Sequence, residues 1–285
     1  MSSQVSSNQN DAVLRGWRDS AAYWRKHCGT IHTMLSPVTQ ALIEEAEIVA
    51  GQSVLDVAGG AGEPSLTIAG IVGPTGSVTC TDAVAEMVAI AQNEGHRRGL
   101  TNVSFQQCSA GSLPFEDESF DATVCRLGAM FFPDPFAALR EMLRVTKSGG
   151  AISLVVWGRS ELNPFSYLIT NFVARYCDVA PADPNAPGAF RFAQPGALAR
   201  ILKEAGANQV KERVLKFHIA APISLEQFWE MRSETSEILR EKLATLSSSQ
   251  AKQLAREAQE AVREFFSNNE MNIPAQMIIV TARKP

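Results

Sequence analysis

The chain has 285 residues, of which 45% are hydrophobic and 20% charged, with a net charge of −4 and a pI near 5.7. No dense block of Lys and Arg occurs, which argues against a nucleic-acid partner. No apolar run approaches the ~20 residues of a membrane span, and the polar first residues do not resemble a secretory signal. The five cysteines are scattered without a C-x-x-C pair, so we expect no metal site and a reducing, cytoplasmic location. A small-molecule partner is the remaining expectation.

From residue 36 onward the chain alternates helical patterns with short apolar strands, which predicts an α/β fold with a doubly wound, mostly parallel, seven-stranded sheet. Ser36 and Pro37 predict the N-cap and first residue of the helix before the first strand. The strand at Gln276–Ala282 is expected to close the sheet beside the sixth strand. The seven predicted strands are 53–58, 77–81, 103–106, 120–125, 151–157, 210–219 and 276–282.

Further helices are predicted between the strands and after the fifth one. Asp134 and Pro135 cap a helix that Gly149 and Gly150 are expected to end, and Ser224 with Gln227 predicts a capping box. A stretch rich in proline and aromatic residues at 158–193 predicts an inserted cap, which includes Pro181, Pro184 and Cys177. The predicted divisions are an N-terminal helical segment (1–35), a core (36–157), the cap (158–193), a continuation of the core (194–223), a helical insertion (224–270) and a final strand (271–285).

The stretch 54–62, Val-Leu-Asp-Val-Ala-Gly-Gly-Ala-Gly, is the most informative part of the chain. Its apolar residues suit a strand buried on both faces, and Gly59, Gly60 and Gly62 form a turn that a ligand can approach closely. Asp56 is a carboxylate inside that strand. Because an unpaired buried charge is costly, Asp56 requires a hydrogen-bond donor or a cation near the end of the strand.

Two ligand classes fit this turn. A dinucleotide fingerprint, Gly-x-Gly-x-x-Gly/Ala, is matched in part by Gly60 and Gly62 but has Ser65 at its third position. The acid followed by an offset glycine cluster instead resembles motif I of the class I S-adenosylmethionine-dependent methyltransferases.

Three further stretches, in the same order, resemble these methyltransferases and in particular their ubiquinone/menaquinone-biosynthesis C-methyltransferase branch. They are Thr81-Asp82 followed by Met87, then Ser109-Ala110-Gly111-Ser112-Leu113-Pro114-Phe115, and then Phe120 through Arg126 and onward to Gly150. The resemblance implies that Asp82 holds the ribose hydroxyls, Met87 packs on the adenine and Ser109 meets the adenine amino group. The implied cofactor-binding residues are Asp56, Ala58, Gly59, Gly60, Gly62, Asp82, Met87, Ser109, Ala110 and Arg126.

The chain departs from this family at three places. Ala58 stands where many members have glycine, Ser109 where an acid is usual, and Met130 and Phe131 where many relatives carry a pair of histidines. The last change leaves the rim of the predicted site apolar.

Catalytic candidates are few, because methyl transfer from a sulfonium depends mainly on positioning. His27, His32 and His218 are the candidates for a general base, and Glu63 is expected near the ligand. Tyr23 or Trp24 is expected to close over the cofactor.

The sequence therefore predicts a methyltransferase that uses S-adenosyl-L-methionine and acts on a small, apolar or aromatic acceptor by C- or O-methylation. Two other functions stay open, a non-catalytic cofactor-binding module of the same fold and an NAD-dependent oxidoreductase. No Tyr-x-x-x-Lys pair that would carry hydride transfer is visible.

Overall fold

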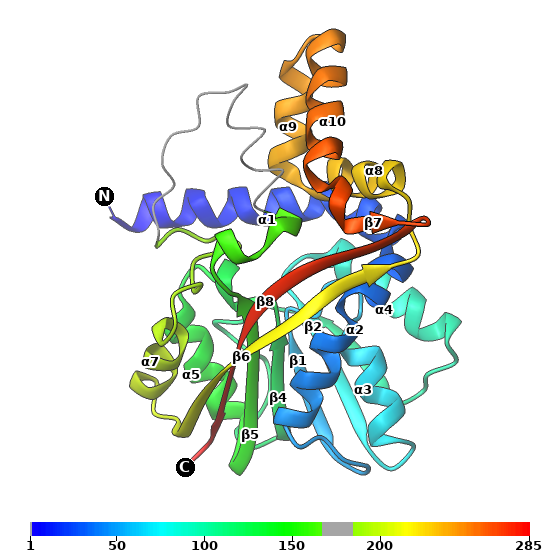
Figure 1. The fold of residues 1–285 in the computed structure, drawn as a ribbon. Coiled ribbons are helices and arrows are strands. Elements are labelled where there is room, and N and C mark those ends of the chain that lie inside the picture. Colours follow the sequence, from blue (N-terminus) through cyan, green and yellow to red (C-terminus); the bar gives the residue numbers. More distant parts are fainter. Residues whose placement is uncertain (1, 167–184) are drawn as a thin grey trace.

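A computed structural model describes residues 2–166 and 185–285; side chains are described from residue 11 onward. The central sheet has the order β3-β2-β1-β4-β5-β8-β6, and a short strand β7 pairs with β8 (Figure 1). This confirms the predicted doubly wound sheet and the place of the last strand beside the sixth. The strands are β1 (Ser53–Val57), β2 (Ser77–Asp82), β3 (Val103–Gln107), β4 (Phe120–Arg126), β5 (Thr146–Trp157), β6 (Asn208–Ala221), β7 (Phe266–Ser267) and β8 (Glu270–Arg283).

Strands β1 to β5 run parallel, and β8 lies antiparallel between β5 and β6. Right-handed crossovers run outward in opposite directions from β1 and β4, so their helices cover opposite faces of the sheet. Helices α3 (Ser65–Val72) and α4 (Ala85–Arg97) pack on β2 and β3, whereas α5 (Pro135–Val145) packs on β5 and α7 (Ala197–Glu204) on β6. The strand order reverses between β1 and β4, which is where ligands bind in open α/β sheets.

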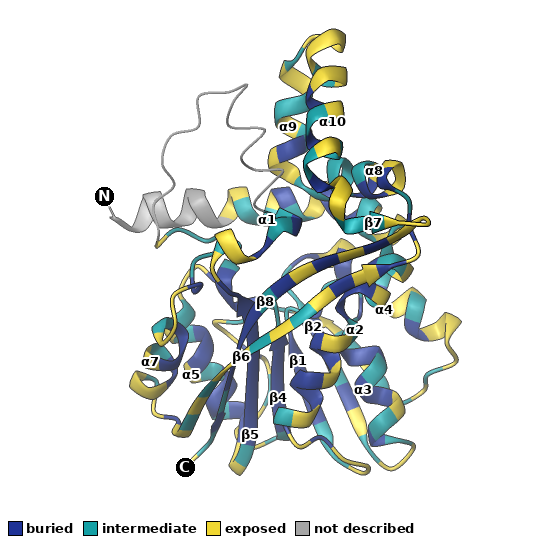
Figure 2. Ribbon diagram, in the orientation of Figure 1, coloured by how far each residue is buried: buried dark blue, intermediate teal, exposed yellow. Residues whose placement is uncertain are grey.

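The central strands form the core. Figure 2 shows them buried along most of their length, whereas β6 alternates between exposed and covered residues. Val54, Leu55, Val124 and Leu154 have no solvent exposure. Their apolar side chains face helices on both sides, as expected for parallel strands.

The helix before β1 begins earlier than predicted. Helix α2 spans Cys28–Glu45 and contains Pro37, so Ser36 is not its N-cap. Proline has no N–H to donate to the carbonyl of Thr33 one turn earlier. The hydroxyl of Ser36 donates to that carbonyl instead (3.0 Å), and the helix continues through the proline.

The prediction that Gly149 and Gly150 end helix α5 was also wrong. Helix α5 starts at its predicted Asp134 cap but ends at Val145, and β5 begins at once with Thr146. Gly149 and Gly150 lie inside the strand, where the pairing with β4 shifts register. A Cβ on Gly150 would lie 2.8 Å from the carbonyl oxygen of Asp121. The glycines therefore permit an irregular strand rather than ending a helix.

The predicted helical insertion contains three helices, α8 (Leu225–Thr235), α9 (Glu237–Thr245) and α10 (Ser248–Val262). The Ser224–Gln227 capping box is present, and Ser247 with Gln250 forms a second one. Helix α1 (Ser2–Lys26) runs across the carboxyl ends of the strands and contacts α8 and α9 (Figure 1). The middle of the predicted cap, with Pro181, Pro184 and Cys177, lies outside the described residues. No helix in the described ranges is long and apolar enough to cross a membrane.

Candidate functional site

A pocket of about 650 Å³ lies at the carboxyl ends of β1, β2 and β4, where the strand order reverses. Its floor is the turn at residues 58–62, here called the glycine turn. Its roof comes from α1 and the first half of α2. The roof residues are Val13, Leu14, Trp17, Trp24, Cys28, Ile31, His32 and Leu35.

The glycine turn is built from left-handed backbone. Ala58 has φ 60° and Gly60 has φ 56°. A non-glycine residue in this region costs roughly 1–2 kcal/mol, which explains why glycine is the usual choice at the position of Ala58. The methyl group of Ala58 faces Gly128, where an added Cβ would lie only 2.5 Å from it. The alanine is therefore accommodated by a glycine on the opposite wall.

Asp82 joins the second strand to the glycine turn. Its Oδ2 accepts a hydrogen bond from Gly60 N (3.0 Å) and its Oδ1 accepts one from Val84 N (2.9 Å). Burial raises the pKa of this carboxyl group, against the opposite effect of these backbone donors. The carboxylate lines the pocket and keeps free lone pairs that can accept from ligand hydroxyls.

Asp56 lies beneath the turn and does not line the pocket. Its Oδ2 accepts from Ser65 Oγ (2.6 Å) and Ser65 N (3.2 Å), while its Oδ1 has no partner among the described residues. Burial raises the pKa of Asp56 to about 7, although the Ser65 hydroxyl and the Arg126 charge lower it. Gly59 packs tightly above, since a Cβ there would meet Asp56 Oδ2 at 2.8 Å. Asp56 thus supports the turn from below.

The raised pKa of Asp56 predicts a dependence of stability on pH. Below the ordinary pKa of 3.8, Asp56 is protonated in both the folded and the unfolded protein. As the pH rises from there toward about 7, the unfolded protein loses this proton first. The free energy of unfolding therefore falls over this range. Asp56→Asn keeps an acceptor for Ser65 and removes the titration. We expect wild type to lose about 1 kcal/mol or more between pH 5 and pH 8, and the variant to lose less, in urea unfolding. Equal losses in both proteins would contradict the assignment.

The structure gathers most of the predicted cofactor residues in one place. Those that line the pocket are Ala58, Gly59, Gly60, Asp82, Met87, Ser109, Ala110 and Arg126, whereas Asp56 and Gly62 lie behind its wall. Ser109 is exposed and accepts from Gly111 N (3.3 Å), which leaves its second lone pair and its hydroxyl hydrogen for a ligand. Met87 is almost fully buried between α4 and α1.

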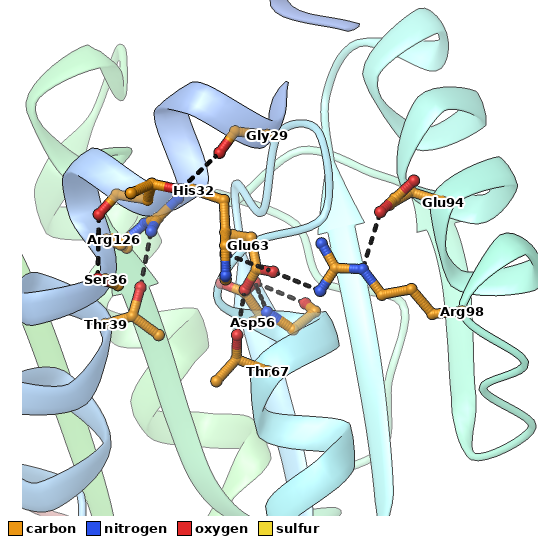
Figure 3. A network of polar contacts seen from close by, with 12 residues as sticks. Gly29, His32, Ser36, Thr39, Asp56, Glu63, Thr67, Glu94, Arg98 and Arg126 are labelled. Carbon is orange, nitrogen blue, oxygen red and sulfur yellow. Dashed lines mark hydrogen bonds and ion pairs between the residues drawn. The ribbon is translucent and has the colours of Figure 1, made fainter. Parts of the chain in front are cut away.

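A polar network closes one end of the pocket (Figure 3). Glu63, which follows the glycine turn, accepts from Arg98 Nη1 (2.7 Å) and Thr67 Oγ1 (2.6 Å). His32 Nδ1 lies 3.0 Å from Glu63 Oε1, without the alignment of a hydrogen bond. Arg98 also pairs with Glu94, so the network links α2, the glycine turn and α4. The prediction that Glu63 lies near the ligand site agrees with this geometry.

The three candidate histidines are in different environments. Only His32 lines the pocket. His27 is bound through Nε2 to Glu234 Oε2 (2.6 Å), a contact that ties the end of α1 to α8. His218 is exposed on β6 opposite Pro274. The positions of His27 and His218 therefore give no support to a catalytic role for either.

Helix α1 contributes residues that the sequence analysis largely missed. Trp17 packs against Trp24 (ring centroids 5.5 Å apart) and against Phe131 (5.2 Å). Tyr23 points away from the pocket, since its ring lies beneath the guanidinium of Arg240. Adjacent helical residues point about 100° apart, so Trp24 and Tyr23 could not both face the pocket. The spacing of Leu14, Trp17, Ala21 and Trp24 is a helical stripe that could have identified this face.

This fold and pocket are those of the class I methyltransferases. The model of the ubiE/COQ5 methyltransferase family matches residues 31–180, and the chain belongs to this family. The uncharacterized methyltransferase YcgJ of Bacillus subtilis is 42% identical over 114 residues, 40% of this chain and 44% of its own. The ubiquinone/menaquinone biosynthesis C-methyltransferase UbiE of Cellvibrio japonicus is 36% identical over 132 residues, 46% of this chain and 52% of its own. The chain thus spans about half the length of the curated relatives it matches.

Solved structures share the fold at low sequence identity. The YcgJ structure from Bacillus subtilis has a TM-score of 0.56 at 24% identity and covers 86% of this chain and 97% of its own. Phosphoethanolamine N-methyltransferase 2 of Haemonchus contortus, solved with phosphomonomethylethanolamine and S-adenosylhomocysteine, has a TM-score of 0.56 at 17% identity, covering 94% and 60%. The [4+2]-cyclase SpnF has a TM-score of 0.51 at 23% identity, covering 87% and 80%. The fold alone therefore does not define the reaction.

Proposed function

We propose that this protein is an S-adenosyl-L-methionine-dependent methyltransferase that methylates carbon or oxygen of a small, apolar or aromatic acceptor. The observation that carries the proposal is Asp82, a pocket carboxylate that also holds the N–H of Gly60 in the glycine turn. Sugar hydroxyls are therefore expected beside a turn that admits close backbone approach. Aromatic rings of Trp17 and Phe131 on the pocket wall favour an apolar or aromatic acceptor.

The polar groups below the turn favour this cofactor over a dinucleotide. A pyrophosphate would need the free N–H groups at the start of α3. There the N–H of Ser65 already donates to Asp56, and Ser65 has no solvent exposure. The carboxylate of Glu63 stands next to the same helix start and would repel phosphate. An NAD-dependent oxidoreductase is therefore disfavoured.

The residues of the chain would bind and orient the reactants. The cofactor supplies a methyl group on a positively charged sulfonium, so no metal or covalent nucleophile is needed. Asp82 would accept from the ribose hydroxyls, and the hydroxyl of Ser109 would meet the adenine. The roof of α1 and α2 would exclude water and hold the acceptor in line, and such positioning can lower a barrier by roughly 7–11 kcal/mol.

His32 is the proposed general base for an acceptor that must lose a proton. Its Nδ1 lies 3.0 Å from Glu63 Oε1, and its Nε2 makes no hydrogen bond within the described chain. We expect His32→Ala to slow methyl transfer about a hundredfold or more at neutral pH. The measurement is transfer of label from methyl-tritiated cofactor, with His218→Ala as the control. An unchanged rate for His32→Ala would show that His32 is not the general base.

The first test of the function is calorimetry with S-adenosylmethionine and S-adenosylhomocysteine. Micromolar or tighter binding of both is expected, and binding of neither would refute the proposal. Binding without label transfer to a panel of phenols, hydroquinones and carbon acids would favour the second candidate, a non-catalytic cofactor-binding module. That alternative is favoured by Ser109 and by Phe131, which lines the pocket where many relatives carry a histidine. Met130, the other replaced position, is buried and does not line the pocket.

A further inference from the structure

Helix α1 is only lightly attached to the core. It packs on α4 in a small apolar cluster around Ala21 and Met87, and among its described residues only Trp24 also packs on the main core. Helix α2, by contrast, is fixed in the main core by Leu35 and Leu42. An element with few buried apolar contacts opens at a lower free energy than one in the core. Of the two helices that roof the pocket, α1 is therefore the one that can move away.

A polar face of α1 lies against α8 and α9 (Figure 1). Positions that recur every three or four residues share one face of a helix. The residues that meet α8 and α9 are Gly16, Ser20, Tyr23 and, directly after the helix, His27. The pocket residues Trp17 and Trp24 lie on the neighbouring face. One side of α1 thus roofs the pocket, and another contacts the helical insertion.

Ion pairs make the contact between the end of α1 and α8. Lys26 Nζ donates to Glu230 Oε1 (2.6 Å) and to Glu234 Oε1 (2.8 Å). His27 Nε2 lies 2.6 Å from the other oxygen of Glu234. Burial alone would raise the pKa of Glu234, but the hydrogen bonds from Lys26 and His27 outweigh burial and lower it. Glu234 is therefore the shared partner of both residues.

Arg240 of α9 makes a second contact with the same face of α1. Its Nη2 donates to Ser20 Oγ (2.7 Å), and its guanidinium lies over the ring of Tyr23, 5.2 Å from the ring centroid. One turn before Ser20, the carboxylate of Glu237 occupies the space that a side chain on Gly16 would fill. These contacts and the ion pairs of Lys26 and His27 are here called the clamp.

We propose that the clamp holds α1 over the pocket and sets how fast ligands enter and leave. This inference rests on the proposed function, which supplies the ligand for its test. The side chains of Lys26 and Glu234 are 47% and 25% exposed. Ion pairs between partly exposed groups are individually weak and are screened by salt. The clamp therefore opens without unfolding the core, and it opens more readily as the salt concentration rises.

The test measures the dissociation rate of tritiated S-adenosylhomocysteine during a chase with unlabelled ligand. Glu234→Gln keeps the shape of the side chain and removes the charge that attracts Lys26. We expect this variant to release the ligand about twofold to tenfold faster than wild type at low salt. Glu260→Gln is the matched control, because Glu260 lies in the same insertion but pairs with Arg263 on the surface of α10. Its release rate should equal that of wild type.

Two further readouts separate an ionic clamp from a general loss of packing. Between 50 mM and 500 mM NaCl, about a tenfold range, release from wild type should accelerate, and release from Glu234→Gln should change less. Without ligand, the backbone amides of α1 should exchange hydrogen faster in Glu234→Gln than in wild type or Glu260→Gln.

Equal release rates in wild type and Glu234→Gln, or an equal response of both to salt, would overturn the inference. If wild type bound no S-adenosylhomocysteine, the proposed function would fail instead. The hydrogen exchange of α1 would still decide whether the clamp holds the roof, and equal exchange in all three proteins would show that it does not.

Discussion

Replacing Asp82 with alanine is expected to weaken binding of S-adenosylhomocysteine by about tenfold to a hundredfold, the effect of losing hydrogen bonds to a charged group. Two losses combine in this variant. The proposed contact with the ribose disappears. The N–H groups of Gly60 and Val84 also lose their acceptor, so the glycine turn is no longer held to the end of β2. Calorimetry measures the change.

The matched control for this variant is Asp117→Ala. Asp117 is largely exposed, pairs with Arg144 on the surface and does not line the pocket. Its removal should leave affinity unchanged. If Asp82→Ala bound the ligand as tightly as wild type, the assigned position of the ribose would be wrong.

Gly59→Ala is expected to destabilise the fold by about 1–3 kcal/mol, as overpacking of a core usually does. A methyl group at this position would lie 2.7 Å from Cys80 Sγ and 2.8 Å from Asp56 Oδ2. Neither neighbour can move easily, because Cys80 is buried in β2 and Asp56 is held by Ser65. Thermal unfolding without ligand measures the loss.

Gly70→Ala is the control for the glycine variant. Gly70 lies in α3, where an added Cβ would meet nothing within 4 Å. Alanine is favoured over glycine in a helix by roughly 0.5–1 kcal/mol, so this variant should be as stable as wild type or slightly more stable. If Gly70→Ala lost as much stability as Gly59→Ala, the loss in Gly59→Ala could not be attributed to crowding of the new methyl group beneath the turn.

The buried strands were predictable because their apolar runs are short and bounded by turn residues. Val54 to Val57 and Phe120 to Cys125 are examples, and both strands lie in the centre of the sheet. The prediction was wrong where a local rule was overridden. Pro37 does not begin a helix, because Ser36 supplies the missing donor, and Gly149 does not end one.

The pocket residues at the ends of the strands were likewise predictable, because the motifs that resemble the methyltransferase family identify them. Asp82 and Ser109 are examples, and both line the pocket. The roof was harder to foresee. The helical stripe of α1 marks the face of Trp17, but where that face packs depends on tertiary contacts that no local pattern encodes. Asp56 shows the opposite error, since a motif residue supports the pocket from behind its wall.

The position of β8 has a consequence for synthesis on the ribosome. Among the described strands β6 hydrogen-bonds only to β8, yet residues 222–269 are translated between the two strands. At about 5–20 residues per second, the β6 segment is expected to spend several seconds without a partner strand. The strand carries three exposed basic residues, Lys211, Arg213 and Lys216. Such charges discourage edge-to-edge association between chains. We therefore expect the alternation of exposed and covered residues in β6 to limit association between chains until β8 has been made.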